Sequence, residues 1–476
     1  MSKDKQIYVS FYEDSDFFAE EIYNPSLTPQ TQFILLDKAR DSINIVFDFE
    51  ANLNGTTQKI SPINSSLIDN KIILFPSSID NTTTGENLDK KILLFIHRWL
   101  DIEEFSEQLC LAYIKMTWIY DRLSVVPYLR AIGDYGSGKT RFIQTIGSLC
   151  YKPMFLAGAT SDAYLFRVIE LFKGTMVVNE LERVNTDLNS QIVNILNNGY
   201  EKGMGIGRIE GDRVKTPVVY DVFCPKVISA REPFKDLALE SRIITNRLYA
   251  TSRNDIPFAL DDSFWSEAEK IRNALLGYRF KYIESQTRRD ADPQINQSNG
   301  GVAGLAGLSL NGSKKQVLND LEPRLRQTMF PLLFVIPEDK MQSFINFTKD
   351  YQKEAIEDRG FELEGICVKA LFQLLETQEE VSIKDLRAKI NEELDSDKFK
   401  ITPQKLGKIL KSLGLKTKPV GHEKISCIIK NETSLNRLRI RFGISDTPQS
   451  PVDTADPQHK DNSMGGGETN DEETKG

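Results

Sequence analysis

Cysteine and histidine are scarce in this chain of 476 residues, and long apolar runs are missing. The five cysteines and three histidines are scattered, with no pair at the spacing of metal ligands, which argues against a zinc site and for a reducing cytosol. The longest apolar runs, such as 329–336, are far shorter than the roughly 20 residues of a membrane-spanning helix. The polar start "MSKDKQIYVSFYED" is unlike a signal peptide. We therefore expect a cytoplasmic protein without a membrane span.

Basic charge is also in deficit, because the formal net charge is -8. The deficit is unevenly distributed. Between Lys400 and Arg441, eleven Lys or Arg stand against two Glu, so this stretch carries +9 and the rest of the chain carries -17. The split indicates one basic module on an otherwise acidic protein.

The chain divides into regions of different pattern. Residues 1–87 contain short apolar runs between turn residues ("QIYVSFY", "QFILLD", "SINIVFDF", "KIILF"), which predict a β-rich domain. Helical spacing from Leu88 to Tyr120 predicts helices in which Trp99 and Trp118 pack into the core. Strands then alternate with helices from 127 to 252, which predicts an α/β core over 88–255 with a parallel sheet flanked by helices. After this core, we expect a helical region at 256–360 that contains a flexible insert at 288–314. A compact module at 361–442 and a disordered tail at 443–476 complete the chain.

The stretch "AIGDYGSGKTRF" fits the pattern G-x-x-x-x-G-K-[ST] at Gly133, Gly138, Lys139 and Thr140. The loop would cradle phosphate oxygens with its backbone N–H groups, Lys139 would reach the β and γ phosphates, and the Thr140 hydroxyl would hold Mg²⁺. A buried strand, "PYLRAI", precedes the loop and an amphipathic helix follows, as this mechanism requires. We therefore predict an ATP site that comprises Gly133, Asp134, Tyr135, Gly136, Ser137, Gly138, Lys139, Thr140 and Arg141.

A phosphate-binding loop also needs an acidic partner on a neighbouring strand. In "GTMVVNELE", Asn179 and Glu180 follow an apolar strand, where the sites of open α/β sheets lie. Asn179 stands where an Asp is usual, so it keeps a carbonyl oxygen for Mg²⁺ but lacks the charge. Glu180 is the predicted base that orients water and a further metal ligand. The alternative is a strand that happens to end in a polar pair.

The stretch "AREPFKDLALESR" (230–242) resembles the sensor 1 and arginine-finger region of AAA+ ATPases. More narrowly, 128–247 looks like ATPases of phages, plasmids and integrated elements that are often labelled helicases or primase-associated proteins. The motifs that carry this likeness are "GDYGSGKTR", "GATSDAYLFRVIE", "GTMVVNELE", "ILNNGYEKG" and "ALESR".

This resemblance implies a ring, commonly a hexamer, in which Arg242 reaches the γ-phosphate bound by a neighbouring copy. The alternative is that Arg242 pairs with a local acid such as Glu240. Arg231 occupies the sensor 1 position, where Asn is usual. The helical region 256–360 would be a lid, in which Arg324 of "PRLRQTMFPLL", or Arg326, acts as sensor 2.

Two regions carry candidate DNA contacts. Glycines between 199 and 211 predict a hairpin whose Lys202, Arg208, Arg213 and Lys215 would line the pore of a ring, with a solvated surface hairpin as the alternative. The order of 361–442 is helix, short strand at 381–383, helix, helix, strand and strand, which resembles a winged helix that would either bind DNA or dock a protein. Its candidate DNA contacts are Lys405, Lys408 and Lys411 on one face of the third helix, and Lys416, Lys418, His422 and Lys424 on the wing.

These patterns together predict an AAA+ ATPase that uses ATP and Mg²⁺ to act on DNA as a helicase or translocase in the replication of a mobile genetic element. The alternative is a nucleotide-gated DNA-binding or partner-recruiting switch that hydrolyses ATP weakly or not at all, because Asn179 replaces Asp. No pattern in residues 1–85 predicts a function for that region.

Overall fold

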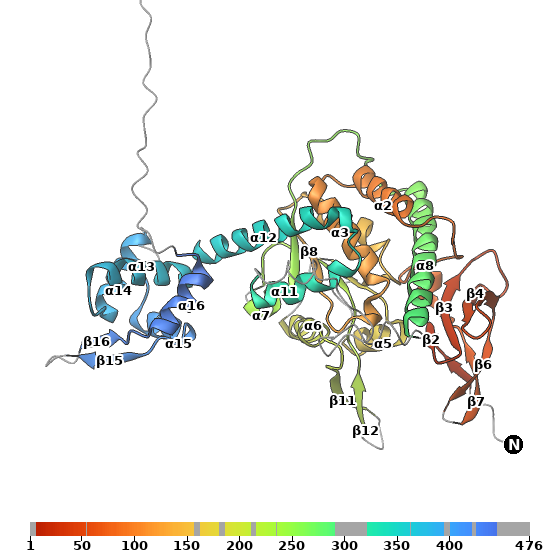
Figure 1. Ribbon diagram of the computed structural model, residues 1–476, viewed down its shortest axis with the longest axis horizontal. Helices are drawn as coiled ribbons and strands as arrows, with labels where there is room; N and C mark the ends of the chain where they lie inside the picture. The colour runs from red at the N-terminus through yellow and green to blue at the C-terminus, as the bar shows by residue number, and fades with distance from the viewer. Residues whose placement is uncertain are drawn as a thin grey trace, which may run out of the picture. The chain divides into compact units, whose positions relative to one another are not determined.

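The computed structural model describes residues 6–53, 55–156, 162–179, 186–210, 216–234, 236–290, 321–361, 363–394, 400–420 and 425–444. The chain forms two compact units, Met1–Gln352 and Lys353–Gly476, and each is described by itself (Figure 1). Across these ranges, no helix is both long and apolar enough to cross a membrane. All five cysteines are free and buried.

Two small sheets begin the first unit. The antiparallel sheet has the order β2 (Phe11–Glu13), β3 (Phe17–Tyr23), β4 (Thr31–Asp37), β5 (Ser42–Val46), and the second sheet has the order β1 (Gln6–Tyr8), β7 (Thr56–Ser61), β6 (Phe49–Leu53). Three of the four predicted runs contain strands, and β3 and β7 lie outside those runs. In β3, Glu20 and Glu21 interrupt the apolar pattern, although both are buried. The run "KIILF" is not a strand, because its buried apolar residues pack in an irregular segment with a single bridge from Ile73 to Met154.

The five-stranded sheet at the centre of the first unit is entirely parallel, as the sequence predicts. Its order is β14 (Ile243–Arg247), β8 (Tyr128–Ile132), β13 (Lys226–Ala230), β10 (Met176–Val178), β9 (Met154–Leu156). The helices α4 (Lys139–Gly147), α5 (Asp162–Phe172), α6 (Thr186–Asn198) and α7 (Leu237–Glu240) connect these strands, and β11 (Ile206–Glu210) pairs with β12 (Thr216–Tyr220) in a separate antiparallel hairpin. Because the strands are parallel, all their carboxyl ends lie at one edge and all their amino ends at the other.

Helices surround this sheet, and most of them contribute buried side chains to the same hydrophobic core, whose buried residues run from Phe18 to Phe344. They are α1 (Ser66–Asp69), α2 (Glu86–Trp99), α3 (Glu104–Thr117), the 3-10 turn η1 (Tyr120–Arg122), α8 (Asp262–Asp290), α11 (Pro323–Met329), the 3-10 turns η4 (Phe330–Phe334) and η5 (Glu338–Lys340), and α12 (Met341–Phe361). Trp99 and Trp118 are buried, so their predicted core role is confirmed. α8 continues to Asp290, so residues 288–290 of the predicted flexible insert are helical, and the rest of the insert lies outside the described residues.

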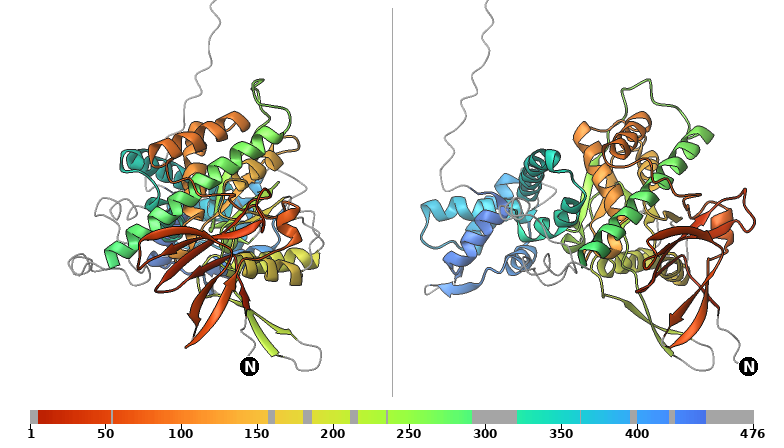
Figure 2. Two further views of the ribbon diagram at one scale, coloured as in Figure 1. Left: turned by 90° about the vertical axis from the view of Figure 1, so that its right-hand side faces the viewer. Right: turned by 45° about the vertical axis from the view of Figure 1, so that its right-hand side comes forward.

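A buried charge network joins three distant parts of the first unit. The Glu20 carboxylate of β3 lies 2.6 Å from Arg279 Nε of α8 and 2.9 Å from Lys152 Nζ, and all three side chains are 1% exposed. Arg279 Nη1 also lies 2.7 Å from an Asp121 oxygen. Burial alone would raise the pKa of the Asp121 carboxyl, but the Arg279 guanidinium more than offsets this and holds it below its ordinary value. Figures 1 and 2 show the result of these contacts, in which α8 lies along the N-terminal sheets.

The second unit has the order of elements that the sequence predicts, with one addition. It contains α13 (Leu363–Thr377), α14 (Ile383–Glu393), α15 (Pro403–Ser412), the antiparallel strands β15 (Thr417–Val420) and β16 (Ile425–Ile428), and a further helix α16 (Glu432–Phe442). The predicted short strand at 381–383 is only a bridge between Ser382 and Cys427. The described residues 443 and 444 are not a tail, because Gly443 ends α16 with a left-handed φ of 65° and Ile444 packs on the core. Residues 445–476 lie outside the described residues.

Removing the guanidinium of the buried network should destabilise the first unit. We expect Arg279→Met to lower its free energy of unfolding by about 3–5 kcal/mol, because the Glu20 carboxylate would stay buried without one of its two cations. Denaturant unfolding followed by fluorescence of the buried tryptophans measures this change.

Glu267→Gln is the matched control on the same helix, since it removes a solvent-exposed ion pair with Arg98 that is also 2.7 Å long. That variant should lose less than about 1 kcal/mol. Equal small losses in the two variants would show that the buried network does not hold the unit together.

Candidate functional site

The glycine-rich loop connects the carboxyl end of β8 to the start of α4. Gly136 and Gly138 have φ values of 80° and 87°, the left-handed region that glycine adopts without strain. A Cβ at either position would meet nothing within 4 Å, so their backbone conformation is what requires glycine. Gly133 differs, because a Cβ there would lie 2.4 Å from Ser137 Oγ and 2.5 Å from the Leu248 carbonyl oxygen. The sequence thus folds into a tight loop that leads into a helix N-terminus.

Lys139 is the first residue of α4 and is almost fully buried. Its Nζ donates hydrogen bonds to the carbonyl oxygens of Gly133 at 2.6 Å and Asp134 at 2.7 Å, which holds the ammonium group against the loop. Tyr135, at the tip of the same loop, is 81% exposed, and its ring centroid lies 5.2 Å from the Arg231 guanidinium carbon. Arg231 follows β13 and is therefore at the predicted edge of the sheet, with its charge against the loop.

Three polar side chains meet beside the loop at the carboxyl ends of β10 and β13. Asn179 Oδ1 accepts a hydrogen bond from Ser229 Oγ at 2.8 Å and lies 3.4 Å from Thr140 Oγ1. Val178 of β10 pairs with Ile228 of β13, so the next residues, Asn179 and Ser229, lie side by side. Thr140 and Asn179, two of the predicted metal ligands, thus lie close together. Ser229 was not among the predicted site residues, and the signal for it was a polar residue near the end of a fully buried strand. Glu180 lies outside the described residues.

The residues of this edge fit a nucleoside triphosphate and Mg²⁺. The first turn of α4 offers backbone N–H groups and the positive end of a helix dipole, and Lys139 adds a full positive charge. Thr140 and Asn179 present neutral oxygens, which Mg²⁺ accepts as ligands. Elsewhere in the described ranges, His, Cys, Asp and Glu form no group of three that could hold a metal ion.

Arg141 does not lie over the phosphate loop as predicted. Its guanidinium donates to the carbonyl oxygens of Pro257 and Phe258, in the segment that leads from β14 to α8. This side chain therefore fastens that segment to the start of α4. A direct contact of Arg141 with a nucleotide would require the loss of these hydrogen bonds.

Arg242 lies at the opposite edge of the sheet from the glycine loop. It precedes β14, whose Ile243 pairs with Tyr128 at the amino end of β8, so the length of the strand separates its backbone from Gly133 of this chain's own loop by roughly 20 Å. Arg242 Nη1 donates to the carbonyl oxygen and side chain of Asn197 at 2.9 and 3.0 Å. The alternative partner Glu240 instead binds the guanidinium of Arg130, so Arg242 does not pair with it.

Arg324 does not contact this chain's own glycine loop, contrary to the prediction for a sensor 2 residue in the same chain. It lies on α11, where Thr328 Oγ1 donates to the carbonyl oxygen of Ser241 at 3.0 Å, so the helix is anchored at the amino edge of the sheet. Arg324 Nη1 donates to Gln327 at 2.8 Å, and Arg326 Nη2 donates to the Leu321 carbonyl oxygen at 3.1 Å. α11 therefore shares an edge with Arg242.

The predicted hairpin exists as β11 and β12. The Arg208 guanidinium carbon lies 4.2 Å from the centroid of the Phe166 ring on α5, and Lys202 Nζ donates to the Asp121 carbonyl oxygen at 2.9 Å. Both cations therefore contact the body of the first unit. Arg213 and Lys215 lie outside the described residues.

The third helix of the second unit, α15, has the two faces that the sequence predicts. One face carries three buried leucines, Leu406, Leu410 and Leu413. The lysines of the other face, and those in and just before β15, are exposed, namely Lys405, Lys408, Lys411, Lys416 and Lys418. Thr402 caps the helix by accepting a hydrogen bond from the Lys405 backbone N–H. Lys418 also forms a long ion pair of 3.7 Å with Glu380. His422 and Lys424 lie outside the described residues.

Comparisons with known proteins give only distant likenesses. The sequence matches no protein-family model and no curated protein. The chain is similar to the apo structure of the NrS-1 C terminal region, with 12% identity, coverage of 87% of this chain and 96% of that chain, and a TM-score of 0.37. It is also similar to the X-ray structure of JCV helicase, with 15% identity, coverage of 53% and 66%, and a TM-score of 0.24. At these TM-scores, neither likeness supports a conclusion about this chain.

Ser229→Ala should impair the site without disrupting the fold. We expect it to lower ATP hydrolysis about tenfold, because Asn179 loses the short hydrogen bond that orients its amide beside Thr140. Steady-state hydrolysis, with thermal unfolding in parallel, measures the effect. Ser263→Ala, which removes an exposed hydroxyl bonded to Asp261, is the matched control. Wild-type turnover in the Ser229 variant would show that Asn179 needs no such support.

Proposed function

We propose that this chain is a P-loop ATPase of the AAA+ type that couples ATP hydrolysis to work on DNA. One observation carries the proposal. The glycine loop, Lys139 and the pair Thr140 and Asn179 converge at the carboxyl edge of a parallel sheet, which is where α/β proteins bind ligands. Phosphoryl transfer requires groups that hold the phosphates and a metal ion. Here these are the glycine loop, the N-terminus of α4, the Lys139 ammonium and the Thr140 hydroxyl.

The residues divide the chemistry among them. The loop amides and Lys139 hold the phosphates, while Thr140 and Asn179 hold Mg²⁺ through neutral oxygens. When bound, Mg²⁺ neutralises charge on the phosphates. Glu180, next to Asn179 in the sequence, is the proposed base that orients the attacking water. Arg231, which lies against Tyr135, supplies positive charge at the same edge.

We propose a ring of copies, with a hexamer as its form, and the position of Arg242 supports it. The backbone of Arg242 lies roughly 20 Å from its own loop, so the phosphate that it would reach is one bound by another copy. Its hydrogen bonds to Asn197 keep it at the amino edge, and α11 with Arg324 lies at that edge too. We propose that this edge of one copy faces the glycine loop of the next.

DNA is the proposed partner because the positive charge of an acidic chain gathers between Lys400 and Arg441, a stretch within the second unit. Lys405, Lys408 and Lys411 form an exposed basic face on α15, the helix that would enter the major groove if this unit is a winged helix. The hairpin with Arg208 is a second proposed contact, within the first unit. The specific activity that we propose is that of a DNA helicase or translocase in the replication of a mobile genetic element.

One observation favours a second function. Asn179 brings no negative charge to the metal position, which weakens Mg²⁺ binding relative to a carboxylate. In that case, the chain is a nucleotide-gated DNA-binding switch that binds ATP tightly and hydrolyses it slowly or not at all.

Steady-state ATP hydrolysis with and without single-stranded and duplex DNA separates the two functions. For a motor, we expect several-fold stimulation by DNA, because movement along the strand is driven by ATP hydrolysis. Lys139→Ala should abolish both the basal and the stimulated rate, since it removes the ammonium group that contacts the phosphates.

Arg98→Ala is the control, because its side chain is solvent-exposed and its only described ion pair is with Glu267. Tight ATP binding without turnover under any condition would contradict the motor and support the switch. Failure of the wild type to bind ATP at all would contradict both.

A further inference from the structure

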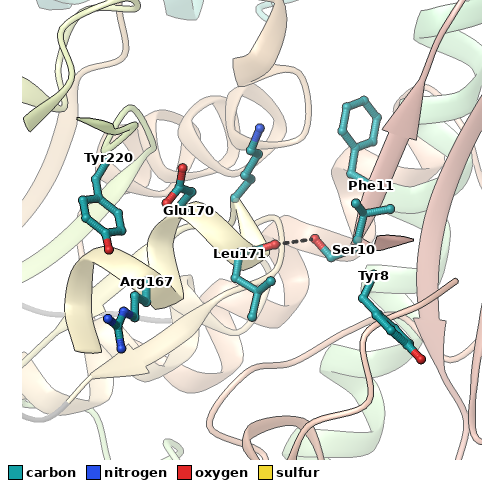
Figure 3. A pocket seen from close by; sticks show the side chains of 9 residues that line it. Tyr8, Ser10, Phe11, Arg167, Glu170, Leu171 and Tyr220 are labelled. Carbon is teal, nitrogen blue, oxygen red and sulfur yellow. Dashed lines mark hydrogen bonds between the residues drawn. The ribbon is translucent and has the colours of Figure 1, made fainter. Parts of the chain in front are cut away.

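A cavity of about 400 Å³ separates the N-terminal sheets from α5 and the end of β12 (Figure 3). One wall is the segment Tyr8–Phe11, which connects β1 to β2. The other wall carries Arg167, Glu170 and Leu171 of α5 together with Tyr220. The volume of the cavity lies in the range of small-molecule sites. No residue of the proposed ATPase site lines it.

The two walls are fixed to each other. Ser10 Oγ donates to the Phe172 carbonyl oxygen at 2.9 Å, and Lys152 Nζ donates to the Ser10 carbonyl oxygen at 2.6 Å. The longer hydrogen bond from Ser10 to the Leu171 carbonyl oxygen, drawn in Figure 3, crosses between Tyr8 on one side and Arg167 and Tyr220 on the other. The cavity is therefore preformed, so a ligand would not need to order its walls.

The lining favours a flat and uncharged ligand. Tyr8 is 56% exposed and Leu171 is 45% exposed, so both present apolar surface to solvent. The charges cancel, because Arg167 is bonded to Glu210 at 3.1 Å and Glu170 interacts with Lys173. The same groups still offer hydrogen-bond donors and acceptors. A heterocyclic base matches this combination, whereas a phosphate would find no excess of positive charge.

The cavity also adjoins the hairpin of the proposed DNA contact. Arg167 binds Glu210 of β11, and the Tyr220 hydroxyl of β12 donates to the same carboxylate. Arg208 of β11 lies over Phe166, the residue before Arg167 on α5. A DNA strand held by the hairpin would thus pass within reach of the cavity.

We propose that this cavity binds an unpaired nucleobase of single-stranded DNA, with the base stacked on Tyr8 and its edge toward Arg167 and Glu170. This inference rests on the proposed function, since it takes DNA as the partner. Single strands are specified because the faces of the bases in a duplex are already stacked, whereas an unpaired base is free to stack on an aromatic ring. The N-terminal sheets then form one wall of a nucleic-acid site.

Equilibrium binding of a labelled oligonucleotide, measured by fluorescence anisotropy on the full chain, tests the inference. We expect Tyr8→Ala to weaken binding of single-stranded DNA about tenfold and Tyr8→Phe to restore it, because stacking needs the ring and not the hydroxyl. Binding of duplex DNA, and of a strand of the same length built from abasic sites, should not change. Phe47→Ala is the matched control, because it removes another half-exposed aromatic side chain near the same sheets that does not line the cavity.

Each outcome decides one question. If the wild type binds single-stranded DNA and Tyr8→Ala binds it equally well, the cavity is not a base site, and the proposed function stands. An equal loss for duplex or abasic DNA would also overturn the inference, since it would show a general effect and not stacking. If the wild type binds no DNA, both the inference and the proposed partner are wrong.

Discussion

The buried carboxylate of Glu20 is the constraint on which the arrangement of the first unit depends. A carboxylate without water must have cations close by, and here Lys152 follows the helix of the glycine loop while Arg279 comes from α8. The network therefore fixes the N-terminal sheets, the parallel-sheet core and the long helix after the core in one geometry. Burial lowers the pKa of Lys152, and the nearby Glu20 carboxylate counteracts this effect, so neither charge is tolerable alone. The same contacts also position one wall of the cavity between Tyr8–Phe11 and α5, because Lys152 Nζ donates to the Ser10 carbonyl oxygen.

The parallel sheet determines where chemistry can occur. Its carboxyl edge gathers the glycine loop, Asn179 and Ser229, while its amino edge carries Arg242 and the helix that begins near Arg324. A single copy cannot bring these two edges together, because the five-residue strands β8 and β14 run from one edge to the other and keep them apart. Separation of the two edges by the strands is thus the physical reason for proposing an assembly of copies.

Local patterns were predictable from the sequence, and contacts between distant segments were not. The glycine loop, the alternation of strands and helices, and the apolar face of α15 are each encoded within a short stretch, and the structure has them. Strand β3 escaped prediction because two acidic residues interrupt its apolar pattern, and the buried Glu20 is tolerated only through partners far away in the chain. Arg141 and Ser229 show the same limit, because their roles depend on which segment lies beside them. Hydrophobicity alone could not tell the irregular run at 71–75 from a strand, since both are buried.

The most direct test of a site shared between copies is a mixing experiment with two variants that each lack one half of it. Lys139→Ala keeps Arg242, and Arg242→Ala keeps the intact loop, so each variant alone should be inactive. When the two are mixed, some interfaces combine an intact loop with an intact Arg242, and we predict that ATP hydrolysis rises well above that of either variant. A mixture that stays as inactive as its components, or an Arg242→Ala variant that hydrolyses ATP at the wild-type rate by itself, would contradict it.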